Sequence, residues 1–117
     1  SESTFTIASG GELIVWATLE IEGVVINEGG TLTGSGTITN NGLVLNKSSN
    51  DYTMTRGDSQ TLKGDFTIAS GESLTIASGQ TLTIASGVTL ENVGILINIG
   101  TFTTTGTLTN TGLALDK

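Results

Sequence analysis

A five-residue phrase recurs along this chain and constrains its fold more than any other feature. The phrase TIASG occupies residues 6–10, 67–71, 75–79 and 83–87. Repetition at short intervals is typical of stacked repeat architectures, in which each unit buries its apolar face against the next unit. A catalytic centre instead needs different residue types that converge on one point, and repetition does not supply them.

A longer duplication contains these phrases. A second phrase closes each half of the chain, as TITNNGLVLNK at 37–47 and TLTNTGLALDK at 107–117. Segments 5–47 and 66–117 therefore read as diverged copies within a single domain, residues 1–117, with an expanded turn at 43–65. We interpret the whole chain as one repeat protein.

Within each half, short alternating runs such as T-L-T end in a glycine every six to eight residues. Alternation with period two places the apolar side chains on one face of a strand and the threonines on the other. Such runs are too short for hairpins with loops of their own, but they suit the sides of a coil. We predict an all-β fold, a parallel β-solenoid of about five to six three-sided turns, uncapped at both ends.

The composition agrees with this prediction. The chain has 17 glycines, no proline, and only three Phe, one Trp and one Tyr, so Leu, Ile and Val must form the core. Val, Ile and Thr favour strands, whereas glycines spread along the chain would weaken long helices.

The solenoid interpretation predicts which residues stack on one another. First sides should stack at 5–7, 24–26, 43–45, 66–68, 89–91 and 107–109. Third sides each begin with threonine, which predicts an outward column of Thr18, Thr37, Thr61, Thr81 and Thr101. The adjacent inward column should hold Leu19, Ile38, Leu62, Leu82 and Phe102.

Two stretches, GTLTNTG at 106–112 and SGQTLTIASGVTLENVG at 78–94, carry a resemblance to known sequences. They resemble the Thr/Gly/Asn-rich β-helix repeats of secreted microbial surface proteins and adhesins, including the filamentous haemagglutinin type. The resemblance is compositional and covers nearly the whole chain. It implies an extracellular or cell-surface location and no particular ligand.

Charge and missing residue types exclude several functions. The net charge is -7, with only four basic residues, which cannot form the basic face that a nucleic acid requires. No apolar run approaches the roughly 20 residues that span a bilayer. The chain has no His and no Cys, so the common catalytic triads are impossible. We expect no enzyme activity, no cofactor and no metal site.

The expanded turn contains the tetrapeptide Arg56-Gly57-Asp58-Ser59, by which some extracellular proteins engage integrins. A polar corner uses the same residue types, so we expect residues 47–60 to protrude as a solvated loop. The alternative is an adhesin fragment whose loop, Arg56, Gly57 and Asp58, binds a host or surface ligand. Three aspartates of this turn are isolated candidates for Ca²⁺ ligands, Asp51, Asp58 and Asp65.

The rows of Thr-x-Thr suggest a second alternative, an ice-binding protein. Outward hydroxyls and methyls on a flat sheet can order water. Glu20 and Lys63 fall in the companion column, however, and their charges would spoil the lattice match.

The ends of the repeat support a different function. A solenoid end exposes unpaired backbone groups and apolar core, and a second copy can satisfy both. We therefore expect a homopolymer, in which head-to-tail stacking of the solenoid builds an extracellular filament with a pilus-, fibre- or sheath-like form. The expected interface residues are Phe5, Ile7, Leu13, Val15, Leu113 and Leu115.

Overall fold

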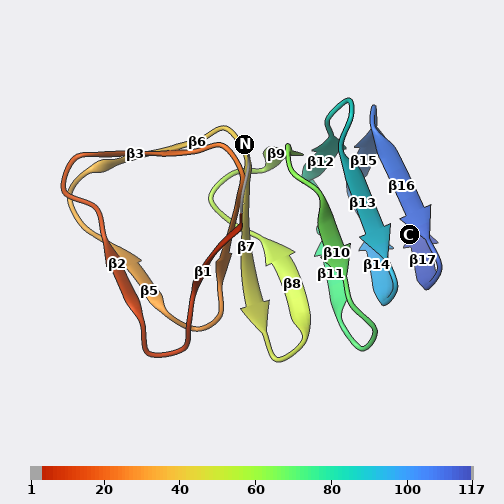
Figure 1. The fold of residues 1–117 in the computed structure, drawn as a ribbon, viewed down its shortest axis with the longest axis horizontal. Coiled ribbons are helices and arrows are strands. Elements are labelled where there is room, and N and C mark those ends of the chain that lie inside the picture. The colour runs from red at the N-terminus through yellow and green to blue at the C-terminus, as the bar shows by residue number, and fades with distance from the viewer. Residues whose placement is uncertain (1–3, 117) are drawn as a thin grey trace.

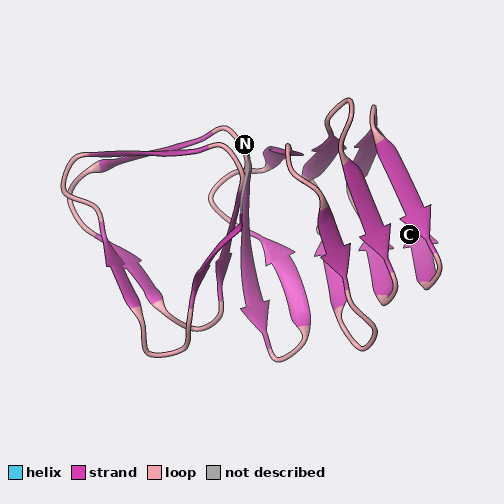
Figure 2. Cartoon of the chain, viewed as in Figure 1, coloured by secondary structure: helices cyan, strands magenta, loops and turns pink. Residues whose placement is uncertain are grey.

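The computed structural model describes residues 4–116, which form seventeen strands joined by turns (Figure 2). Nearly all strand pairs are parallel, and the stacked coils make a β-solenoid of about six turns. The all-β solenoid predicted from the repeats is confirmed. Within these residues, no helix long and apolar enough to cross a membrane is present.

The first stack of coils occupies the N-terminal part of the chain. Its strands are β1 (Thr4–Ile7), β2 (Glu12–Ile14), β3 (Thr18–Ile21), β4 (Val24–Asn27), β5 (Thr31–Thr33), β6 (Thr37–Asn40) and β7 (Leu43–Ser48). Like sides pair in parallel, as β1–β4–β7, β2–β5 and β3–β6. The expected stacking of these sides is confirmed, with 24–26 opposite 43–45, but 5–7 lies opposite 25–27, one residue from the expected register.

The second stack follows the same plan with three walls. Its strands are β8 (Asp51–Met54), β9 (Ser59–Leu62), β10 (Phe66–Ile68), β11 (Ser73–Ile76), β12 (Thr81–Ile84), β13 (Thr89–Asn92), β14 (Ile95–Asn98), β15 (Thr101–Thr104), β16 (Thr107–Asn110) and β17 (Leu113–Asp116). The parallel walls are β8–β11–β14–β17, β9–β12–β15 and β10–β13–β16.

An antiparallel hairpin joins the two stacks. Strands β7 and β8 pair antiparallel, with Leu45 opposite Met54, so one seven-stranded sheet runs from β1 to β17. We call this sheet the shared wall. Figure 1 shows the first stack as a triangle on one side of the wall and the second stack as a row of coils beyond it. Ser49 makes the tight reversal with a left-handed φ of 57°.

The two stacks bury their cores on opposite faces of the shared wall. Val25 and Val44 point into the first core, with Ile7 and Ile21. The residues between them in the sequence point the other way, into the second core: Val24, Ile26, Leu43 and Leu45. Strands β4 and β7 are therefore buried on both faces, as runs of three consecutive apolar residues allow.

Both stacks wind with the same hand, although the chain reverses between them. Crossing the β7–β8 hairpin inverts the strand direction, and it also moves the coil interior to the other face of the wall. The order of the strands in the wall continues without interruption from β1 to β17. Two inversions cancel, so the sense of winding is preserved.

The hairpin also corrects the predicted stacking. After β7 the shared wall continues through β8, β11, β14 and β17. Residues 66–68 were expected in this wall, but they begin a separate sheet, in which Phe66 lies opposite Leu90. The expected threonine column is divided as well. Thr18 lies opposite Thr37 and Thr81 opposite Thr101, but Thr61 lies opposite Thr83 in another register.

Candidate functional site

The six residues expected at the assembly contact lie on the first and last coils, but the structure buries two of them. Phe5 on β1 and Leu113 on β17 are each 51% exposed. Leu13 and Leu115 are half-buried. Ile7 and Val15 are only 4% and 7% exposed, so they belong to the core of the first stack and not to a contact surface.

Strands β1 and β17 form the two edges of the shared wall. Within residues 4–116, β1 pairs only with β4, and β17 pairs only with β14. An edge strand presents a row of backbone N–H and C=O groups that can pair with another strand. Phe5 and Leu113 therefore sit on the two strands of this sheet that are open to a further partner.

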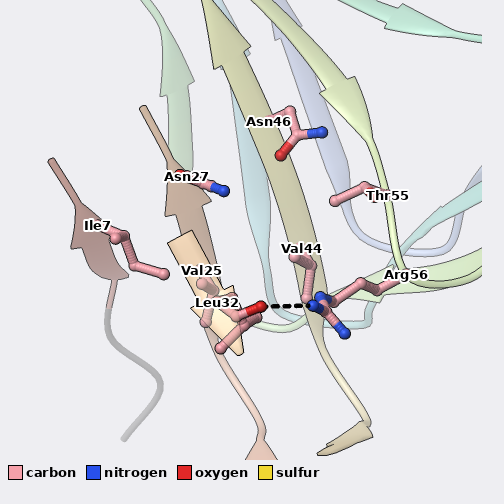
Figure 3. Close-up of a pocket in the computed structure, with 8 residues that line it drawn as sticks. All are labelled: Ile7, Val25, Asn27, Leu32, Val44, Asn46, Thr55 and Arg56. Atoms are coloured by element: carbon pink, nitrogen blue, oxygen red, sulfur yellow. Dashed lines mark hydrogen bonds between the residues drawn. The ribbon is translucent and has the colours of Figure 1, made fainter. Parts of the chain in front are cut away.

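The loop with the sequence Arg56-Gly57-Asp58 is exposed, but it is shorter than expected. The expectation that 47–60 protrudes is wrong, because β7 extends to Ser48 and β8 and β9 occupy most of the remainder. Arg56 has a left-handed φ of 63°, and its Nη2 atom donates to the Leu32 carbonyl oxygen at 3.4 Å. The guanidinium thus lies over the end of the first stack, as Figure 3 shows.

A hollow of about 220 Å³ opens beneath Arg56 (Figure 3). Its apolar floor includes Val25, Leu32 and Val44, which are interior residues of the first stack. The hollow exists because the third coil of this stack is incomplete: after β7 the chain leaves for the hairpin. Arg56 is the only charged residue in its described lining, so no acid–base pair faces this space.

Gln60 anchors this loop, and sequence reasoning missed it. The side chain is 4% exposed, and its Oε1 accepts from the Val44 N–H at 2.7 Å and from Asn40 Nδ2 at 3.0 Å. Its Nε2 donates to the carbonyl oxygens of Thr55 and Gly57, both at 2.7 Å. No motif marks a single glutamine, because its role depends on the hairpin that brings β9 beside β7.

The carboxylates of the expanded turn do not form a metal site. Asp51 accepts from the Ser73 hydroxyl, and Asp65 Oδ1 accepts from the Thr89 N–H at 2.8 Å. Asp58 is exposed on the loop. In the described part of the chain, no three acidic side chains gather closely enough to hold a metal ion.

A cluster of Lys47, Tyr52 and Glu72 ties the hairpin to the second stack. Lys47 Nζ lies 2.8 Å from Glu72 Oε2 and 5.2 Å from the centre of the Tyr52 ring. The hydrogen bond to Glu72 raises the pKa of Lys47. Burial pushes the pKa of Glu72 upward, but bonds from Lys47 and the Ala69 N–H outweigh it and lower that pKa. Burial also raises the pKa of Tyr52.

The threonines suggested for ice binding form narrow patches. In the wall β9–β12–β15, outward Thr81 and Thr83 pair with Thr101 and Thr103. In the neighbouring wall, Glu91 lies opposite Thr109 and interrupts the outward row. Trp16, the only tryptophan, is 74% exposed at the corner between β2 and β3.

Comparisons with known protein families, with characterised proteins and with solved structures found no match to this chain.

Proposed function

We propose that this chain is the structural subunit of an extracellular filament, built by head-to-tail addition of copies along the shared wall. The observation that carries the proposal is the pair of open edges, β1 and β17, at opposite ends of one sheet. Each edge strand carries an apolar side chain that is half exposed, Phe5 and Leu113.

The free energy for assembly would come from backbone hydrogen bonds and apolar contacts that the two edge strands do not make within one copy. Joining β17 of one copy to β1 of the next would pair backbone groups that otherwise face water. It would also cover apolar surface, at about 25 cal/mol for each Å² removed from water. Because the two edges differ, the contact is heterologous, and a heterologous contact that does not close into a ring continues as a filament.

The two alternative functions have weaker support. An adhesive loop would present Arg56 and Asp58 freely, but the Arg56 guanidinium bonds Leu32 and the loop backbone is held by Gln60. An ice-binding face would need long threonine columns, and the aligned column Thr61–Thr83–Thr103 extends over only three coils.

Electron microscopy and analytical ultracentrifugation of the purified chain over a wide concentration range test the proposal. We expect unbranched filaments above a critical concentration. A chain that stays monomeric at millimolar concentration would refute the filament. Thermal hysteresis in the same sample would then favour ice binding.

A further inference from the structure

Four strands of the shared wall have apolar residues at three consecutive positions. They are VVI in β4, LVL in β7, ILI in β14 and LAL in β17. This pattern is typical of strands that are buried on both faces. The structure buries β4 and β7 on both faces, but on the outer face of β14 and β17 it leaves Ile95 and Leu113 exposed and Ile97 and Leu115 half-buried.

The outer face of the wall, away from the coil interior, changes from polar to apolar in each stack. In the first stack, Thr4 and Thr6 on β1 are exposed, and the next two strands carry Val24, Ile26, Leu43 and Leu45. In the second stack, the strands β8 and β11 carry Asp51, Thr53, Ser73 and Thr75 on this face, and the next two carry Ile95, Ile97, Leu113 and Leu115.

The apolar outer face on β4 and β7 is covered by other coils, whereas that on β14 and β17 is not. The coils that begin at β8 cover the face on β4 and β7, so that Val24 is 3% and Leu45 0% exposed. On β14 and β17, Ile95 is 38% and Leu113 51% exposed. The internal duplication makes β7 and β17 equivalent, since each follows a strand of sequence T-x-T-N, β6 or β16. The β7–β8 junction is therefore a template for a strand that pairs with β17.

We infer that the outer face of β14 and β17, formed by Ile95, Ile97, Leu113 and Leu115, is the docking surface for the first stack of a second copy. The β1 strand of that copy pairs antiparallel with β17, as β8 pairs with β7. This inference rests on the proposed filament and defines its subunit contact.

The faces of the wall on which the edge side chains lie favour an antiparallel join over a parallel one. Phe5 on β1 shares a face of the wall with Leu113 and Leu115, and the first stack lies on that face. A copy that extends the wall beyond β17, with β1 antiparallel to β17 and each face continued, therefore sets its first coil over the exposed isoleucines and leucines. A parallel join needs a half-turn about the stacking direction. That rotation places the first stack on the opposite face and leaves Ile95 and Leu113 in water.

The first coil has the surface that this join requires. Its interior residues Phe5, Leu13 and Leu19 face the open end of the stack, where Phe5 is half exposed and the two leucines are half-buried. Tyr52, Met54 and Phe66 provide the corresponding cover at the β7–β8 junction. Seven strands per copy at about 4.8 Å then give a subunit repeat of at most about 34 Å along the filament.

Disulfide crosslinking tests the direction of the join, because the chain has no cysteine of its own. Thr4, Thr6, Ala114 and Asp116 are exposed edge positions on one face of the wall. Antiparallel pairing centred on these strands brings Thr6 beside Ala114 and Thr4 beside Asp116. We expect oxidised Thr6→Cys/Ala114→Cys and Thr4→Cys/Asp116→Cys filaments to form covalent multimers in denaturing gels.

Two alternative pairings serve as matched controls. The half-turn of a parallel join would bring Thr4 and Thr6 onto the face of Leu113 and Leu115, so the controls are Thr4→Cys/Leu113→Cys and Thr6→Cys/Leu115→Cys. If filaments form and these controls crosslink preferentially, the antiparallel inference is wrong and the filament proposal survives. If the cysteine-free chain does not assemble, both proposals fail.

A polar outer face tests the docking surface. Replacing Ile95, Ile97, Leu113 and Leu115 by Thr copies the outer face of β11 and keeps residues that favour strands. We expect native circular dichroism and a critical concentration at least about tenfold higher, because the join no longer buries apolar area. The control Ile14→Thr alters an exposed side chain on the outer face of β2, in a wall separate from the shared wall, and should leave assembly unchanged. Unchanged assembly of the quadruple variant would overturn the inference.

Discussion

The side-chain oxygen of Gln60 accepts the backbone N–H of Val44 at 2.7 Å. In a continuing stack, a carbonyl group of the next coil would occupy this place. The amide side chain therefore ends the ladder of the first stack, while its Nε2 atom holds the loop after β8 through Thr55 and Gly57. One buried residue thus allows the chain to stop one stack and begin another.

Replacing Gln60 by Met should destabilise the protein by about 2–3 kcal/mol, because the buried N–H of Val44 and the Thr55 carbonyl oxygen lose their partner. Urea unfolding followed by circular dichroism measures the difference. Gln80→Met is the matched control, since Gln80 makes similar bonds to Ala77 and Met54 from a half-buried position. An equal loss in both variants would contradict the special role of Gln60.

The sequence predicted the coils correctly because a coil is a local pattern. Alternation and a corner glycine repeat in every side, so the strands and most of their inward residues can be derived from periodicity. The hairpin depends instead on the contact between β7 and β8, and the expanded turn concealed it. One signal was available: the run Leu43-Val44-Leu45 has no polar residue between its apolar ones, which indicated burial on both faces of the strand.

The candidate site was only partly predictable for the same reason. Phe5 and Leu113 were expected at the interface because they begin and end the repeat, and the structure places both on open edge strands. Of the proposed docking face, Leu113 and Leu115 were expected but Ile95 and Ile97 were missed, since the sequence does not show on which side of the wall each stack lies. Burial of Ile7 and Val15 results from packing within the first stack, which a list of terminal residues does not capture.

Two glycines of the second stack should respond differently to alanine. At Gly100, a Cβ would collide with the carbonyl oxygens of Ala77 and Gln80 in the preceding coil. These are backbone atoms, so the clash could be relieved only by shifting the coil itself. We expect Gly100→Ala to cost more than about 3 kcal/mol. Gly79 has open space around it but a φ of 85°, so Gly79→Ala should cost about 1 kcal/mol. Thermal unfolding of both variants provides the comparison.

The Lys47–Glu72 pair should make stability depend on pH. The folded state lowers the pKa of Glu72 below its ordinary value of 4.5, so its contribution is present above that pH and is lost as the pH falls. The raised pKa of Lys47 keeps the pair charged until the pH exceeds 10.5. We expect Glu72→Gln to cost about 1–2 kcal/mol at pH 7.

Urea unfolding of wild type and Glu72→Gln from pH 3 to pH 8 checks this expectation. The difference between the two proteins should shrink below pH 4.5, because protonated Glu72 no longer attracts Lys47. Glu28→Gln, at an exposed carboxylate, is the control and should have little effect. A difference that stays constant across this range would show that Glu72 acts through packing and not through charge.

Salt should promote assembly. Each copy carries a net charge of -7, so copies that approach end to end repel one another. Raising the ionic strength from about 0.01 M to 0.15 M shortens the screening length from about 30 Å to about 8 Å. Light scattering should then show a lower critical concentration. A higher critical concentration in salt would indicate a contact that depends on ion pairs, contrary to the apolar join.

Proline substitutions in β17 should distinguish residues needed for stability of the second stack from residues needed only for assembly. The Leu113 N–H donates to the Gly94 carbonyl oxygen at 2.9 Å, so Leu113→Pro should weaken the second stack itself. In a parallel ladder alternate residues point their backbone groups to opposite sides, which directs the Ala114 N–H away from β14 and toward a further strand. We therefore expect Ala114→Pro to keep the thermal stability of the monomer within about 1 kcal/mol and to abolish filaments in negative-stain images. If Ala114→Pro assembles like the wild type, β17 does not pair with a neighbouring copy, and the edge would have to be excluded from the filament contact.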